Sequence, residues 1–248
     1  MSFIPNEFLV NVSRGKVVGA EPFDGFGRRA TAGAEANVLW PDGAWVNPVS
    51  TGVQLSVVST SASDGVGGTG IRSLELHYLD ANLAPQSEIL ILNGTTPVLT
   101  AATNIRFMQC MHMDTFGSTK AAVGTITASN GGNTHSQVSV QRVRCESSMR
   151  MVPAGKRLFV TSFSAGSISG TAAASTIISL ASSKFGDHDY TADSAFIPLG
   201  SFGMQDTTAT ITIPVPLVFE EGVIFGMTFV TDKAAIVVGT WFGWLENA

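Results

Sequence analysis

Charged residues are scarce in this chain of 248 residues: Asp, Glu, Lys and Arg make up 13% of it, against roughly 25% in an average soluble protein. Only 14 residues are Lys or Arg, and the formal net charge is -5. The sequence therefore lacks the basic surface that nucleic acids select. A surface with so few charges stays soluble when copies of the same chain or a partner protein cover much of it. We expect protein contacts and no nucleic-acid binding.

Cysteine and long apolar runs are also in short supply. The only cysteines are Cys110 and Cys145, so we expect no disulfide framework, and a single bridge between them is left open. One of the longest apolar runs, residues 223–230, is far shorter than the roughly 20 residues of a membrane-spanning helix. We therefore expect no membrane insertion.

Apolar residues are seldom spaced as in an amphipathic helix, and in several segments they alternate as in a β-strand. Residues 71–79 alternate, with Leu74, Leu76 and Tyr78 on one face, as a β-strand requires. Residues 170–183 are the one Ala-rich helix candidate, but their Ile, Thr and Ser content favours a strand. Strand and turn signals alternate about every 10 to 15 residues, which is typical of a sandwich or barrel.

Residues 53–98 carry the strongest pattern in the chain. They read as three strands and two turns, and the last strand closes at the tight-turn dipeptide Asn93-Gly94. This pattern predicts a β-meander around which the rest of the chain is organised.

The chain divides into two predicted parts. Residues 51–248 predict an all-β fold, an antiparallel β-sandwich. A turn at residues 151–156 allows two halves, about 51–150 and 151–248. Residues 1–50, which are irregular and contain four prolines, predict an extended N-terminal arm.

Isolated aromatic residues are the main feature of this arm. Such rings do not suit a solvated linker, so we expect them to pack on a neighbouring subunit or back on the chain's own sandwich, and both alternatives stay open. The last strand is apolar on both faces and is expected to be buried in the core or against another copy. The candidate oligomer or particle contacts are Phe3, Phe8, Phe23, Phe26, Trp40, Trp45, Trp241, Phe242 and Trp244.

The histidines and cysteines do not form a recognisable metal motif. Cys110 and His112 would share a strand face, and with His77 they offer three ligands. The sequence has no CxxC or HxxxH spacing here, and plain packing of a small thiol is the favoured interpretation. We expect no metal and no cofactor.

Catalytic motifs are missing as well. Asp187, His188 and Asp189 suggest part of a Ser-His-Asp arrangement, but neighbouring residues of a strand point to opposite faces, and this segment looks like a polar loop. The sequence contains no GxSxG elbow, no Walker loop and no HExxH. We expect no catalytic residue and no enzyme activity.

One modest basic cluster lies near the middle of the chain. It would contact an acidic partner surface or, as we favour, form a solvated edge whose charge discourages aggregation. Its members are Arg142, Arg144, Arg150, Lys156 and Arg157.

Several segments together resemble a family of virion structural proteins of tailed bacteriophages. The family pattern runs SSSxxDxxxGTGxRxxxxxxLD, ETVxLNGTT, GTI and VPAGK. The matching segments here are residues 59–64, 68–72, 79–80, 88–96, 124–126 and 152–156, and residues 12–15 and 26–28 are similar to the N-terminal part of the family. Each motif consists mainly of turn residues, and residues 85–87 (PQS) depart from the acidic or polar residues that are more usual there.

The resemblance implies a non-enzymatic virion subunit with a jelly-roll-like β-sandwich over residues 51–248, which forms a symmetric oligomer, a trimer above all. Its partners would be copies of itself and other virion proteins, such as the major capsid protein or tail proteins. The leading hypothesis is an outer capsid decoration or head-fibre protein, anchored to the shell by the arm of residues 1–50.

Two alternatives stay open. One is a tail or baseplate subunit, a fibre or adhesin, that contacts the host surface. The other is a carbohydrate-acting module, which paired carboxylates and aromatic residues would support. The candidate carboxylates are Asp187, Asp189 and Asp193.

Overall fold

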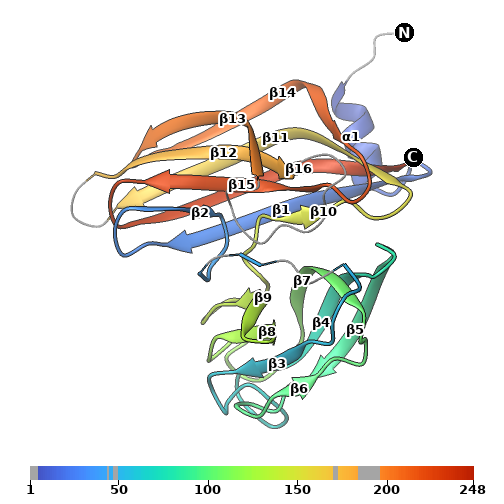
Figure 1. Ribbon diagram of the computed structural model, residues 1–248, viewed down its shortest axis with the longest axis vertical. Coiled ribbons are helices and arrows are strands. Elements are labelled where there is room, and N and C mark those ends of the chain that lie inside the picture. The colour runs from blue at the N-terminus through green and yellow to red at the C-terminus, as the bar shows by residue number, and fades with distance from the viewer. Residues whose placement is uncertain (1–4, 44, 47–49, 170–172, 184–195) are drawn as a thin grey trace.

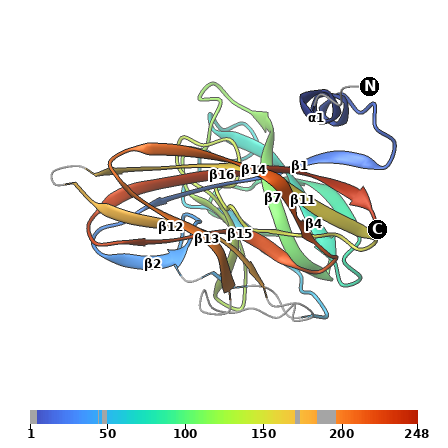
Figure 2. The same cartoon turned by 90° about the horizontal axis from the view of Figure 1, so that it is seen from above.

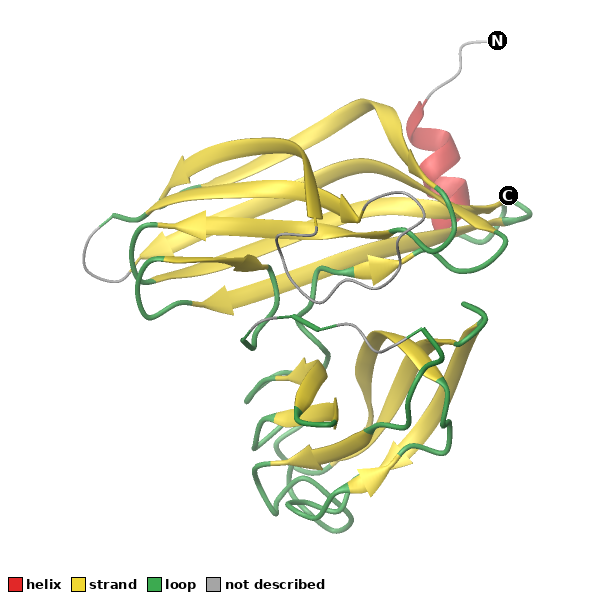
Figure 3. Cartoon of the chain, viewed as in Figure 1, coloured by secondary structure: helices red, strands yellow, loops and turns green. Residues whose placement is uncertain are grey.

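The computed structural model describes residues 5–43, 45–46, 50–169, 173–183 and 196–248. Strands account for almost all of the regular structure in these ranges (Figure 3). The elements are α1 (Pro5–Ser13), β1 (Ala20–Ala30), β2 (Glu35–Val38), β3 (Ser56–Ser59), β4 (Ile71–Asp80), β5 (Pro85–Ile91), β6 (Val98–Leu99), β7 (Ile105–Phe116), β8 (Ile126–Asn130), β9 (Asn133–Val138), β10 (Arg150–Met151), β11 (Lys156–Ser169), β12 (Ser175–Ser183), β13 (Phe196–Gln205), β14 (Thr208–Phe219), β15 (Ile224–Thr231) and β16 (Ala235–Asn247). Within the described ranges, no helix has the length and apolar character needed to cross a bilayer.

The larger of two units, which we call the large sandwich, contains β1, β2 and β10–β16 (Figure 1). One antiparallel sheet has the order β1-β16-β11-β14, and the other has the order β10-β15-β12-β13 with β2 also paired to β15. A hydrophobic cluster fills the space between them, with Phe163 and Trp241 from the first sheet and Phe225 and Met227 from the second. Burial of such side chains between two sheets stabilises a sandwich. The predicted all-β antiparallel sandwich is confirmed.

Strands β3–β9 form a second group, the small unit, seen below the large sandwich in Figure 1. Its two sheets have the orders β5-β4-β7 and β6-β3-β8-β9. The alternation predicted for β4 is confirmed, because Leu74, Leu76 and Tyr78 belong to the core of the small unit while Glu75 and His77 are partly exposed. The small unit has sheets and a core of its own, so the jelly-roll-like form predicted for residues 51–248 is wrong. The two halves that the sequence allowed, about 51–150 and 151–248, agree with the groups β3–β9 and β10–β16.

A third hydrophobic cluster joins the two units. It combines Leu79 and Phe107 from the small unit, Ile224 from the large sandwich, and Trp40 and Trp45 from the segment that connects them. Both tryptophans are almost fully buried there. Separating the units would expose this apolar surface to water, so the hydrophobic effect holds them together.

Residues 20–38 do not form an extended arm. β1 pairs with β16 over its full length, from Ala20 opposite Glu246 to Ala30 opposite Ile236, and β2 pairs with β15. The predicted arm over residues 1–50 is therefore wrong for this part of the chain, which packs on its own sandwich. Of the two alternatives that the sequence left open, packing on the chain's own sandwich holds for residues 20–38, because backbone hydrogen bonds to β16 and β15 stabilise them. Figure 2 shows α1 at the edge of the large sandwich, beside the start of β1.

The predicted meander over residues 53–98 is also wrong in one respect. β4 pairs with β5 as expected, but β3 pairs with β6 and β8 in the opposite sheet. The loop of residues 61–70 therefore carries the chain from one sheet to the other.

Asp64 lies at the centre of this loop, and its carboxylate is fully buried. It accepts hydrogen bonds from the hydroxyl of Ser59 (2.7 Å) and from the backbone N–H groups of Ile71 (2.9 Å), Val123 (3.0 Å) and Gly124 (2.8 Å). A carboxylate that accepts this many hydrogen bonds is stable in a buried site.

Several segments that carry the sequence resemblance meet at this carboxylate. Residues 59–64, 68–72 and 124–126 all contribute a group that binds Asp64. Residues 88–96 join them, because the carbonyl of Gly94 accepts a hydrogen bond from the N–H of Ser59 (3.0 Å). These motif residues therefore build one structural element of the small unit.

Candidate functional site

Four of the aromatic residues predicted as contacts are core residues of this chain. Trp40 and Trp241 are 1% and 0% exposed, and Trp45 and Trp244 are nearly as buried. The indole N–H of Trp241 donates to the carbonyl of Ser148 (2.8 Å). Their own chain surrounds these side chains, so the prediction that they contact another subunit is wrong.

Phe8 and Phe23 are partly buried against two of these tryptophans. The ring of Phe8, on α1, meets Trp244 edge to face, with 5.2 Å between ring centroids, and Phe23 on β1 lies 5.9 Å from Trp241. Both therefore attach N-terminal residues to the large sandwich. Phe3 lies outside the described residues.

Phe26 and Phe242 are the predicted contacts that reach the surface of the large sandwich. Phe242 is 51% exposed. Phe26 is partly covered by Arg144, whose guanidinium carbon lies 5.4 Å from the ring centroid, a cation–π geometry.

The segment that follows β9 is held at the junction by a disulfide between Cys110, on β7, and Cys145. This settles the pairing that the sequence left open. The sulfur of Cys110 is bound to Cys145 and does not form a thiolate site with His77 and His112, although these two rings lie 5.2 Å apart. Among the described residues there is no group of three or more side chains suited to a metal ion. Asp187, His188, Asp189 and Asp193 lie outside the described residues.

Three of the five clustered basic residues form ion pairs. Arg142 pairs with the buried Glu146, with 3.0 Å between Nε and Oε1, while Oε2 of Glu146 has no hydrogen-bond partner in the described chain. Lys156 pairs with a glutamate of β1 (3.1 Å) and Arg157 with the glutamate after β14 (3.0 Å). These contacts match the favoured interpretation of solvated surface charge for Lys156 and Arg157.

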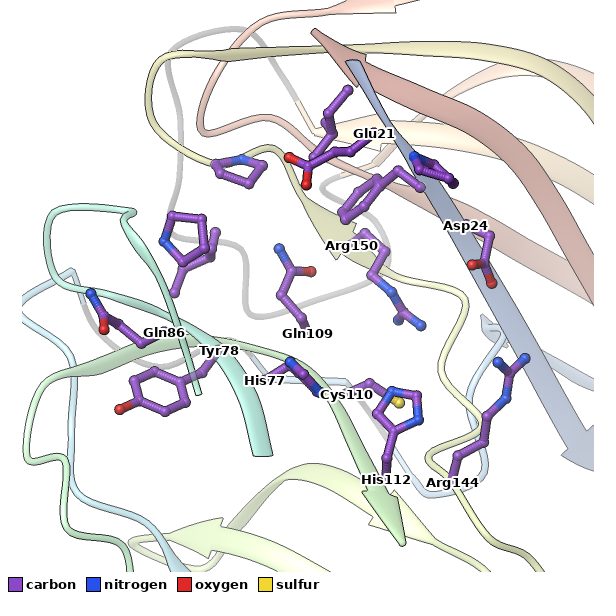
Figure 4. Close-up of a pocket in the computed structure, with 16 residues that line it drawn as sticks. Glu21, Asp24, His77, Tyr78, Gln86, Gln109, Cys110, His112, Arg144 and Arg150 are labelled. Atoms are coloured by element: carbon purple, nitrogen blue, oxygen red, sulfur yellow. The ribbon is translucent and has the colours of Figure 1, made fainter. Parts of the chain in front are cut away.

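Arg144 and Arg150 face a cavity of about 340 Å³ between the two units. Residues of β1, β4 and β7 form its walls together with residues of the segment between β9 and β11, which include Arg144 and Arg150. Figure 4 shows Asp24, His112, Arg144 and Arg150 pointing toward one common space. This cavity is the candidate functional site.

Arg150 is buried at the edge of this cavity and is 7% exposed. Its Nη1 donates to the carbonyls of Ser147 (2.9 Å) and Met149 (2.8 Å). Burial lowers the pKa of Arg150 to about 10, an effect that Asp24 opposes and Arg144 reinforces. The guanidinium is therefore still charged at neutral pH.

His112 stands beside these arginines. Burial lowers its pKa below 6.5, and the nearby His77, Arg150 and Arg144 lower it further, while Glu75 acts in the opposite direction. His112 is therefore neutral at pH 7 and offers one N–H donor and one nitrogen acceptor.

Gln109 links the two units beside the cavity. Its Nε2 donates to the carbonyl of Met151 (2.6 Å), and its Oε1 accepts from the N–H of Met151 (3.3 Å). Sequence reasoning missed both Gln109 and Asp24 because each becomes notable only when the two units meet.

A second candidate surface is the edge of the large sandwich where β13 and β14 lie. Each is the last strand in the order of its sheet, and neither contains a charged residue. Leu199, Ile211, Val215 and Val218 are 43%, 38%, 78% and 49% exposed there. The 24 residues from 196 to 219 contain no Lys, Arg or Glu. This feature of the sequence could have indicated the surface.

Apolar side chains are also exposed near the N-terminus. On α1, Leu9 and Val10 are 38% and 41% exposed, and Val18, just before β1, is fully exposed. Val12, by contrast, is buried. α1 therefore presents apolar side chains that the other described residues leave partly exposed.

Comparisons with known proteins give no family. No family model matches the chain, and no curated protein matches it. A solved structure of infectious bursal disease virus, strain Gx, aligns over 92% of this chain and 82% of its own with 7% identity, at a TM-score of 0.13. At that TM-score the likeness supports no argument about fold or function.

Proposed function

We propose that this chain is a non-enzymatic structural subunit of a bacteriophage virion, an outer capsid decoration or head-fibre protein that assembles as a trimer. The observation that carries the proposal is the uncharged, apolar and exposed edge of β13 and β14. Native proteins usually protect a sheet edge with charges, above all Lys. An edge without them is suited to contact with another copy of the chain.

Two prolines on β14 narrow the kind of contact. Pro214 and Pro216 have no N–H to donate, so a partner strand cannot extend the sheet along this stretch. The copies would therefore pack through side chains such as Val215 and Val218, in a closed oligomer rather than an open-ended fibre of strands.

The resemblance to tailed-phage virion proteins supports a place in the virion. Several of its motif segments build the turn around Asp64 and so serve the fold. The anchoring role falls to α1 and its exposed Leu9 and Val10 rather than to all of residues 1–50, because β1 and β2 belong to the sandwich.

The test is to locate the chain on intact phage particles with a labelled antibody. Label over the capsid supports the decoration or head-fibre proposal. Label confined to the tail would contradict it and favour a tail or baseplate subunit, whose next test is competition with infection.

A matched variant tests the anchor. Removing residues 1–18 leaves β1 intact, so the chain should keep its strand content in circular dichroism and its oligomeric mass. It should no longer bind particles that lack the protein. Binding equal to that of the full chain would show that α1 is not the anchor.

A further inference from the structure

The cavity between the units has charged and polar side chains in its walls, although the rest of the junction is apolar. Asp24 reaches it from β1, His112 from β7, Arg144 from the segment between β9 and β10, and Arg150 from β10, and Figure 4 shows all four directed to the same space. Three regions that are distant in sequence thus place polar groups around one volume.

Charges of opposite sign face each other there without pairing. Within the described chain, no carboxylate lies within 4.0 Å of the guanidinium of Arg144 or Arg150, and no cation lies that close to Asp24. Arg150 is buried without a counter-ion among the described residues, which is destabilising even though two carbonyls accept from its Nη1, whereas Asp24 is exposed. A molecule with acceptors at one end and donors at the other would satisfy both sides.

This requirement narrows the chemistry of the ligand. Sulfate offers only acceptors, and phosphate at pH 7 carries no more than two O–H donors beside one or two negative charges that Asp24 would repel. A sugar acid has one carboxylate to accept from Arg144 and Arg150, and several hydroxyls to donate to Asp24 or to the imidazole of His112.

The size and the remaining walls suit the same chemistry. A volume of about 340 Å³ lies at the small end of ligand cavities. The other lining residues include Phe23, Tyr78 and three prolines, Pro22, Pro85 and Pro153, beside polar residues such as Glu21 and Gln109. Flat apolar surfaces of this kind pack against the C–H face of a sugar ring.

We propose that the cavity binds one residue of a sugar acid, a hexose-sized ring that carries a carboxylate. The site is independent of self-assembly, because residues of β13 and β14 do not line it.

Calorimetric titration of the full chain with D-glucuronate tests the proposal. Saturable binding is expected for D-glucuronate and none for D-glucose, which differs in lacking the carboxylate. Inorganic phosphate should not displace D-glucuronate. The proposal is overturned if D-glucose binds equally well, if phosphate competes, or if D-glucuronate gives no binding at concentrations up to about 10 mM.

Matched arginine variants assign the binding to this cavity. Arg144→Gln should weaken D-glucuronate binding by about tenfold or more, because it removes one of the two charges that receive the carboxylate. Arg157→Gln, at a surface ion pair outside the cavity, should bind like the unaltered chain. Equal affinity in a folded Arg144→Gln variant would contradict the assignment.

Oligogalacturonides distinguish two sources of the same chemistry. Tighter binding of the oligogalacturonide than of the single sugar acid would identify an acidic surface polysaccharide as the ligand. Binding of the monomer alone would identify a free sugar acid. Both results support a sugar-acid site.

Discussion

Asp64 shows how one side chain can organise a loop that has little apolar content. Its two carboxylate oxygens accept four hydrogen bonds from residues on both sides of the loop and from residues 123 and 124. The space around it is full, because a Cβ added at Gly70 would lie 2.0 Å from its Oδ1. The loop therefore depends on this carboxylate and on the small residues around it.

Asp64→Asn should lower the free energy of unfolding by about 2–4 kcal/mol, because an amide cannot accept at both of its ends and leaves buried donors unpaired. Urea denaturation monitored by circular dichroism would measure the loss. Asp42→Asn is the control, since the carboxylate of Asp42 makes no hydrogen bond in the described chain, and it should change stability by less than about 0.5 kcal/mol. Equal stability of both variants would show that Asp64 does not hold the loop.

Two histidines link stability to pH. Burial lowers the pKa of His112 and of His135, and in His135 a hydrogen bond with the carbonyl of Val46 acts in the opposite direction. Both are neutral in the folded chain at pH values where the unfolded chain, with a histidine pKa near 6.5, takes up protons. Since the unfolded state then binds more protons, stability present above pH 6.5 is lost as the pH falls.

The free energy of unfolding should therefore decrease between about pH 7.5 and pH 5.5, by at most about 1.4 kcal/mol per pH unit for each histidine. Urea denaturation at several pH values measures it. His112→Gln cannot take up the proton, so its decrease should be smaller than that of the unaltered chain. The same decrease in both proteins would mean that His112 does not contribute.

At the scale of elements, strand β1 could not be predicted from its sequence. Its inward positions after Phe23 are Gly25 and Gly27, where the chain has no room for a side chain. A Cβ at Gly25 would lie 2.4 Å from both the carbonyl oxygen of Ser148 and Nε1 of Trp241. The buried face of β1 is thus filled by neighbouring residues, and the apolar alternation that marks a strand is missing.

Gly25→Ala should destabilise the chain by about 1–3 kcal/mol, because Trp241 and the backbone at Ser148 must move to admit the methyl group. Thermal unfolding followed by circular dichroism would show it. Gly200→Ala is a matched control on strand β13, where a Cβ meets nothing within 4 Å, and its stability should be unchanged or slightly higher. A Gly25→Ala chain as stable as the control would contradict the close packing of β1.

Most other strands could be predicted because they contain many β-branched and apolar residues. β4, β7, β11, β12, β14, β15 and β16 all fall where β-branched and apolar residues predict them. α1 was not predicted, since it is a short helix that covers only part of one face and is stabilised by the contact of Phe8 with Trp244. Local pattern therefore predicts strands but not the elements stabilised by distant residues.

At the scale of the whole molecule, the missing information is which strands pair. The sequence does not show that β1 adjoins β16, or that β3 leaves the sheet of β4. The disulfide of Cys110 with Cys145 and the cavity of Arg144 and Arg150 depend on how these units meet. The candidate site was therefore predictable only as a cluster of basic residues without a location.

The central claim is that copies of this chain assemble through the uncharged edge of β13 and β14. Its most direct test is the solution mass of the full chain by sedimentation equilibrium, beside Val215→Lys and the control Val66→Lys. Val66 is equally exposed but lies in the small unit. Unaltered chain and Val66→Lys should have three times the 25.9 kDa of one chain, and folded Val215→Lys should have 25.9 kDa. An unaltered chain that stays at 25.9 kDa, or a Val215→Lys variant with the mass of the unaltered oligomer, would contradict the account.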